Sequence, residues 1–146
     1  MARPLAIRSG IAALFIEGAL WSTIRLLSFT YELAQGADLG PQHQTPGWLR
    51  LRFVGISVAV AGVLFLAGAG LRNGARWPGR VAQALAAVVN VVLLVRGIAA
   101  FVRFSGAQAA VAAAFVVILA VAALSGLAFD ARSIGRERPS GVTPGP

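Results

Sequence analysis

The chain has 146 residues, of which 58% are hydrophobic and 12% charged, too apolar a composition for a soluble domain of this size to bury. It has no cysteine and one histidine, His43, which excludes a disulfide framework, thiolate metal sites and haem held by two imidazoles. The net charge of +8 comes from arginines that flank the hydrophobic segments, which favours membrane topology signals over nucleic-acid binding. We therefore expect a protein whose first partner is the lipid bilayer.

Four apolar stretches are each long enough to cross a bilayer as a helix, which takes about 20 residues. They cover residues 9-32, 51-71, 81-104 and 107-129. Strands of a membrane β-barrel would be shorter and would alternate between apolar and polar residues. The sequence therefore predicts an all-α, integral membrane four-helix bundle with short loops over residues 1-131. The polar, proline-containing segment 132-146 is predicted to be a disordered cytoplasmic tail.

The arginines also predict the orientation, because the cytoplasmic side of a membrane protein carries the excess of positive charge. The two chain ends and the second loop would share one side, which holds Arg3, Arg8, Arg72, Arg76, Arg80, Arg132, Arg136 and Arg138. The opposite side holds fewer, Arg50, Arg52 and Arg103. We expect both termini in the cytoplasm. The use of arginine without lysine, with abundant alanine and glycine, favours a bacterial inner (plasma) membrane.

The first segment carries polar side chains that follow one another at steps of three or four residues, and such steps place them on one helix face. These residues are Glu17, Trp21, Arg25, Ser28 and Glu32. The third segment carries an inward stripe at steps of seven, Gln83, Asn90 and Gly97. Glu17 and Asn90 fall at similar depths, so we predict that the first and third helices face each other and that these two residues form an intramembrane polar pair. Two interpretations stay open, a structural hydrogen bond and a role in transport.

Arginines near the outer ends of the helices form a candidate site for an anionic group. They are Arg25, Arg50, Arg52, Arg96 and Arg103. Arg25 and Arg96 would meet at one depth, and two guanidinium groups in hydrocarbon need a counter-anion unless they extend to the headgroups. Binding of an anionic lipid and simple extension of Arg25 to the interface are both open.

Small residues mark a packing face on the second segment, at Gly55, Ala59 and Gly62, and the fourth segment is rich in alanine. Small side chains let membrane helices approach closely. We expect this face to pack within the bundle, against a protein partner, or against a second copy of the chain.

Motifs for metalloproteases, serine hydrolases and phosphate-binding loops are absent from the sequence. We therefore expect no enzyme activity, no catalytic residue, no metal site and no cofactor. The interpretation that remains is a non-catalytic, small polytopic membrane protein. It would be an accessory or structural subunit of a membrane complex, or a binder of an anionic lipid or a lipophilic ligand.

The alternative is a small proton-coupled transporter that uses Glu17. A glutamate in the first of four helices resembles the small multidrug resistance exporters, in which that glutamate couples protons to drug efflux. The resemblance covers this one position and the helix count. The first loop is larger here, and the tryptophan-glycine signature of the third helix is absent. The resemblance therefore implies a role for Glu17 without assigning the chain to that family.

Overall fold

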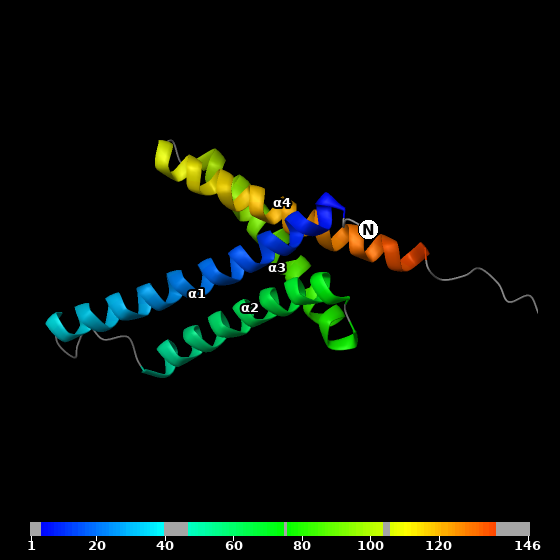
Figure 1. Ribbon diagram of the computed structural model, residues 1–146. Coiled ribbons are helices and arrows are strands. Elements are labelled where there is room, and N and C mark those ends of the chain that lie inside the picture. The colour runs from blue at the N-terminus through cyan, green and yellow to red at the C-terminus, as the bar shows by residue number, and fades with distance from the viewer. Residues whose placement is uncertain (1–3, 40–46, 75, 104–105, 137–146) are drawn as a thin grey trace, which may run out of the picture.

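The computed structural model describes residues 4–39, 47–74, 76–103 and 106–136. All regular structure in these residues is helical: α1 (Leu5–Leu39), α2 (Gly47–Asn73), α3 (Trp77–Arg103) and α4 (Ala107–Arg136) (Figure 1). Each helix contains a stretch long and apolar enough to cross a membrane. The prediction of a helical protein with four apolar helices of membrane-spanning length is confirmed for the described residues.

The helices extend beyond the apolar stretches from which they were predicted. α1 continues to Leu39, well into the predicted first loop, although its apolar span ends at Ser28. α4 continues to Arg136, so residues 132–136 of the predicted tail are helical, and the rest of that tail lies outside the described residues. Hydropathy detects only the apolar part of a helix. The polar extensions of α1 and α4 contain no proline, so nothing in them stops the helix.

The turn between α2 and α3 contains residues that suit a helix end and a helix start. α2 ends at Asn73, and Gly74 adopts a φ of 81°, a left-handed conformation that favours glycine. Pro78 lies in the first turn of α3, where its missing N–H removes no helical hydrogen bond. The chain therefore reverses direction within a few residues.

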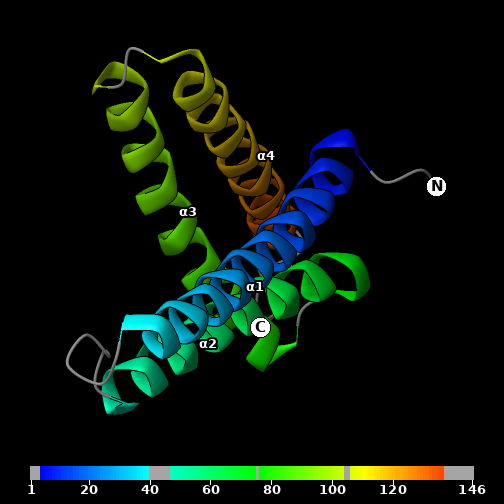
Figure 2. The ribbon, with the colours of Figure 1, turned by 90° about the vertical axis from the view of Figure 1, so that its left-hand side faces the viewer.

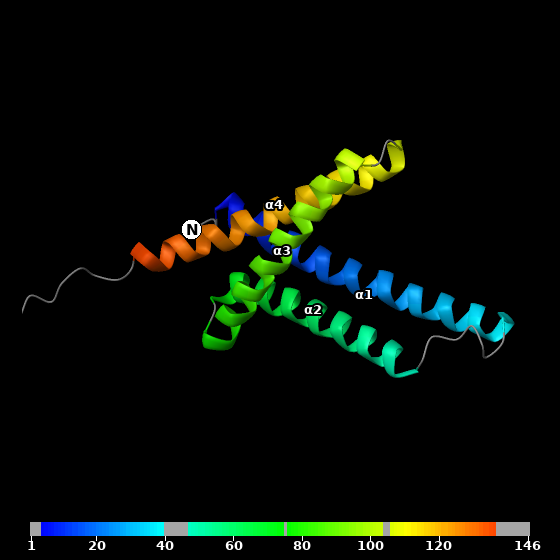
Figure 3. The ribbon, with the colours of Figure 1, turned by 180° about the vertical axis from the view of Figure 1, so that it is seen from behind.

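The helices form two hairpins, α1–α2 and α3–α4. The hairpins pack together at a closed end (around Gly10, Gly74 and Gly126) and diverge toward an open end (around Arg52 and Arg103), as Figures 1 and 2 show. The view from behind shows the same divergence (Figure 3).

Helix neighbours differ from the prediction. α1 packs against α2 and α4, and α3 packs against α4 and α2, while the backbones of α1 and α3 do not come close to each other in the described residues. The first and third helices are therefore diagonal and not adjacent, so the polar stripes that were predicted to face each other can do so only through their side chains. A side chain from one can meet a side chain from the other only across the interior.

Glycine explains why α4 takes the place beside α1. A Cβ atom on Gly10 would lie 2.7 Å from the Cα of Gly126, and a Cβ on Gly126 would lie 3.0 Å from the carbonyl oxygen of Ala6. Backbones approach this closely only where side chains are absent or very small. The small residues repeat at four-residue steps on both helices, Ala6 and Gly10 on α1, Ala122 and Gly126 on α4.

A reciprocal contact of phenyl rings and glycines sets the register of α1 against α2. The Phe65 ring covers Gly18, where a Cβ would lie 3.1 Å from the ring, and the Phe15 ring covers Gly68 at 3.2 Å. The centroids of the two rings are 5.8 Å apart, with their planes tilted by 44°. Such tilted aromatic pairs are favourable. This contact therefore fixes how far α1 and α2 are shifted along each other.

The interior is built mainly from small side chains, and large apolar side chains point outward. Ala67, Ala86 and Ala123 are fully buried, whereas Val102 and Val111 on the outer surface are 80% and 70% exposed. Membrane helices associate through close packing of small residues, and lipid covers the large apolar side chains. The distribution is that of a membrane protein.

Candidate ligand-binding cavity

Three polar side chains are buried in the described interior: Glu17, Ser57 and Asn90. The Ser57 hydroxyl donates to the Phe53 carbonyl at 2.7 Å, the usual arrangement for a serine within an apolar helix. Glu17, only 7% exposed, and Asn90, fully buried, are not accounted for in this way. They are the two residues that the sequence predicts to form a polar pair.

Glu17 and Asn90 approach each other across the interior, and their side chains lie close enough to interact. The Asn90 amide nitrogen donates to the Ala86 carbonyl at 3.0 Å, which leaves its Oδ1 without a hydrogen-bond partner. Neither carboxyl oxygen of Glu17 completes a hydrogen bond within the described structure. Three buried acceptor oxygens are therefore left unfilled, and each is costly in a medium without water.

Glu17 lines an apolar cavity of about 260 Å³ between the two hairpins. All four helices contribute to its wall, with Glu17, Leu20, Trp21 and Ile24 from α1, Leu64 from α2, Leu93 from α3, and Phe115, Val116 and Leu119 from α4. Ile24 and Phe115 are about half exposed, so the cavity reaches the outer apolar surface. Its α1 wall residues follow the Gly10 contact along the helix, on the side toward the open end.

The size of the cavity limits what it can hold. An apolar cavity of roughly 150 Å³ takes benzene, and pockets for drug-sized ligands begin at about 300 Å³. At about 260 Å³, this cavity suits a small molecule of one or two rings or a short acyl segment. It is too small for a whole phospholipid.

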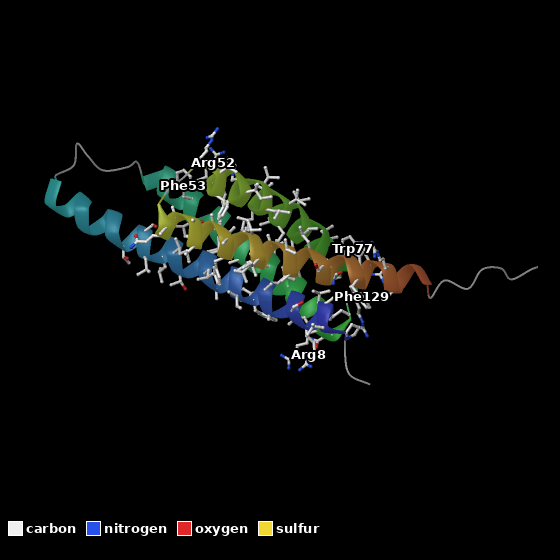
Figure 4. All side chains as sticks on the ribbon, turned by 90° about the horizontal axis from the view of Figure 1, so that it is seen from above. Arg8, Arg52, Phe53, Trp77 and Phe129 are labelled. Carbon is white, nitrogen blue, oxygen red and sulfur yellow. The ribbon has the colours of Figure 1, made fainter. Side chains whose placement is uncertain are left out.

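Arginines gather at the closed end of the molecule. Figure 4 shows Arg8, Trp77 and Phe129 near this end, and Arg52 and Phe53 toward the opposite end. The other closed-end arginines whose side chains are described are also exposed, Arg72, Arg76, Arg80 and Arg132. The predicted asymmetry of charge between the two ends is therefore present in the fold.

The candidate anion site is not assembled by the described residues. Arg52 is exposed on one hairpin, and Arg96 and Arg103 are exposed on the other, where the two hairpins diverge (Figure 2). The side chains of Arg25 and Arg50 lie outside the described part of the chain. The divergence of the hairpins, which arginine spacing does not reveal, separates Arg52 on α2 from the two arginines on α3.

The predicted packing face on α2 has no neighbour within the chain. A Cβ on Gly55 or on Gly62 would meet no atom within 4 Å, and Ala59 is exposed. Of the alternatives left open for this face, packing within the bundle is excluded for the described residues. Two of the glycines that do pack, Gly10 and Gly126, carry a signal in the sequence, since each of these two follows an alanine by four residues.

The stripe at steps of seven on α3 does turn inward, but its ends face α4. The Gln83 amide donates to Asp130 Oδ2 at 3.3 Å, and a Cβ on Gly97 would lie 2.9 Å from Cγ2 of Val117. The link from Gln83 to Asp130 was not predicted, because Asp130 falls just beyond the fourth apolar stretch. In the described ranges, no three histidine, cysteine or acidic side chains come together as metal ligands.

The fold defines the class of this protein as a multi-pass α-helical membrane protein. No known protein family matches the chain, and no curated protein or solved structure resembles it significantly. The cavity around Glu17 and the residues of its wall are therefore the features that bear on function.

Proposed function

We propose that this chain is a non-catalytic membrane protein that holds a lipophilic ligand in the cavity around Glu17. The observation that carries the proposal is an apolar cavity of about 260 Å³ with a single buried acid in its wall. An empty cavity of this size leaves its wall without packing contacts, and an occupant would restore them. The half-exposed rim residues Ile24 and Phe115 would let the ligand enter from the bilayer.

Between the two ligand classes expected from the sequence, the geometry favours the lipophilic one. An anionic headgroup needs several cationic side chains at one place. Arg52 and Arg103 belong to hairpins that diverge, and both are exposed. The cavity, in contrast, has walls from all four helices.

The proposal includes an orientation in the bacterial inner membrane. The closed end carries most of the exposed arginines, so the positive-inside rule assigns it, with both termini, to the cytoplasm. The cavity then lies beyond the Gly10 contact toward the external side.

A role as an accessory subunit is a second candidate, and it has its own support. Gly55, Ala59 and Gly62 form a small-residue face that nothing in the chain covers. If a partner helix packs there, Gly62→Leu should leave the folded chain intact and release the partner during gentle purification. An unchanged complex size with Gly62→Leu would exclude this role for the face.

Proton-coupled transport is the alternative use of the same cavity, since Glu17 is the one buried acid among the described residues. Vesicles containing the protein would then accumulate a lipophilic substrate when a pH gradient is imposed. Glu17→Gln would abolish that accumulation. Equal accumulation by wild type and Glu17→Gln would exclude the transport role.

Ligand binding can be measured through Trp21, which lines the cavity. In a variant with Trp48→Phe and Trp77→Phe, titration with para-bromotoluene in lipid nanodiscs should quench Trp21 fluorescence in a saturable manner. A matched variant that retains only Trp77, which is 79% exposed at the closed end, should show quenching that rises linearly with probe in the bilayer. Filling the cavity with Leu93→Phe and Val116→Phe should remove the saturable phase. Linear quenching in all three proteins would refute the proposal.

A further inference from the structure

Three of the buried polar atoms at the cavity are acceptor oxygens. Both oxygens of Glu17 are hydrogen-bond acceptors without a partner, and the neighbouring Asn90 Oδ1 is a third. Unfilled acceptors are completed by donors, so the head of a matching ligand carries N–H or O–H groups.

The electrostatics of the cavity narrow this choice. A carboxylate in an apolar site without a counter-charge costs several kcal/mol. No arginine among the described residues lines the cavity. The side chain of Arg25, which follows Glu17 by eight residues, lies outside the described part of the chain. A ligand that carries a positive charge would therefore supply the counter-charge for Glu17.

The rest of the wall suits a cation attached to an apolar body. Trp21 and Phe115 both line the cavity, and the faces of aromatic rings attract ammonium groups. The remaining wall residues are aliphatic, for example Leu20, Leu64 and Leu119. Such a wall would bind hydrocarbon without preference for its exact shape.

We propose that the cavity selects a lipophilic amine, whose ammonium group donates its N–H bonds to Glu17 while its apolar body fills the space between the hairpins. This inference rests on the proposed function and names the ligand class of the same site. A quaternary ammonium brings charge but no N–H donor, so it satisfies only half of the requirement. An alcohol brings a donor without the charge.

The test compares probes that share one ring and differ only in the head group. Selectivity is measured by saturable quenching of Trp21 in zwitterionic nanodiscs, in the chain with Trp48→Phe and Trp77→Phe whose cavity residues are all wild type. The probes are para-bromobenzylamine, para-bromobenzyl alcohol and the trimethylammonium analogue of the amine. We expect the amine to bind at least tenfold more tightly than either of the other two.

Substitutions then assign the selectivity to Glu17. Glu17→Gln keeps the shape of the side chain and should weaken amine binding at least tenfold, while affinity for the alcohol stays within about twofold. Asp130→Asn removes an acid that lies outside the cavity and should leave amine affinity unchanged.

The outcomes separate the two proposals. Equal affinity of wild type for amine and alcohol would overturn the amine inference and leave the lipophilic site standing. Amine selectivity that persists in Glu17→Gln would also overturn it. The absence of saturable binding for every probe, para-bromotoluene included, would overturn the proposed function itself.

Discussion

At the scale of single residues, Glu17 is the group that needs an explanation. It is buried to 7% exposure in a span that lipid surrounds, and neither of its oxygens has a hydrogen-bond partner in the described structure. Ionisable side chains inside membrane spans are costly and are commonly retained for function. Its position in the cavity wall supports the proposed ligand-binding role, whereas a purely structural role would rest on hydrogen bonding to the neighbouring Asn90.

Stability distinguishes these two roles. Glu17→Leu replaces an unsatisfied polar group with an apolar one of similar size, and we expect the free energy of unfolding in detergent to rise by about 1–3 kcal/mol. A structural hydrogen bond with Asn90 would give the opposite sign. The measurement is reversible unfolding followed by circular dichroism, with Ser57→Ala as a control at a satisfied buried polar group. A loss of stability in Glu17→Leu would contradict the ligand-site account.

At the scale of helices, contacts between small residues decide which elements are neighbours. α1 meets α4 where Gly10 lies on Gly126, and it meets α2 where phenyl rings lie on Gly18 and Gly68. The Gly10 contact is between backbones, so an added methyl group there would overlap the Cα of Gly126, whereas at Gly18 and Gly68 the phenyl ring would have to shift to make room.

Two glycine-to-alanine substitutions test this directly. In Gly10→Ala the new Cβ would lie 2.7 Å from the Cα of Gly126, so we expect a loss of about 1–3 kcal/mol in the free energy of unfolding despite the better helix propensity of alanine. In Gly62→Ala the new Cβ would meet nothing within 4 Å, and stability should change by less than about 0.5 kcal/mol. Equal effects of the two substitutions on unfolding would show that α1 and α4 do not cross at Gly10.

The sequence predicts features that depend on one helix at a time. The four spans, the turn at Gly74 and the inward stripe through Asn90 all follow from local hydropathy, turn chemistry and periodicity. Neighbour relations between helices depend on contacts between distant segments, and small residues on several faces allow more than one arrangement. The diagonal placement of α1 and α3 and the contact of Gly10 with Gly126 were missed for that reason.

The cavity could not be predicted from the sequence, because most of its wall residues carry no signal there. Glu17 and Trp21 fall on one predicted face, and the structure confirms that both line the same site. Leu64, Leu93 and Phe115 have no polar signal, and they become wall residues only because the two hairpins diverge.

At the scale of the whole molecule, the two ends differ in charge and in packing. Exposed arginines such as Arg8 and Arg72 occupy the closed end, and the hairpins diverge toward the other end (Figures 2 and 4). With the closed end in the cytoplasm, a ligand would reach Glu17 from the outer half of the bilayer.

The orientation can be tested with single cysteines, because the chain has none of its own. Asn73 lies at the closed end and Gly106 precedes α4 at the open end, and both are exposed. In intact cells, a membrane-impermeant maleimide should label Gly106→Cys and should label Asn73→Cys only after the membrane is opened. The reverse pattern would place both termini outside.

The central claim is that the cavity around Glu17 holds a lipophilic ligand, and native mass spectrometry of the protein purified gently from its own membrane tests it most directly. We predict that each wild-type chain carries one small molecule. The mass and fragmentation of the bound molecules should identify most of them as amines. The cavity-filled variant with Leu93→Phe and Val116→Phe should lack it. The same set of bound molecules on both proteins, or a wild-type chain that carries none, would contradict the account.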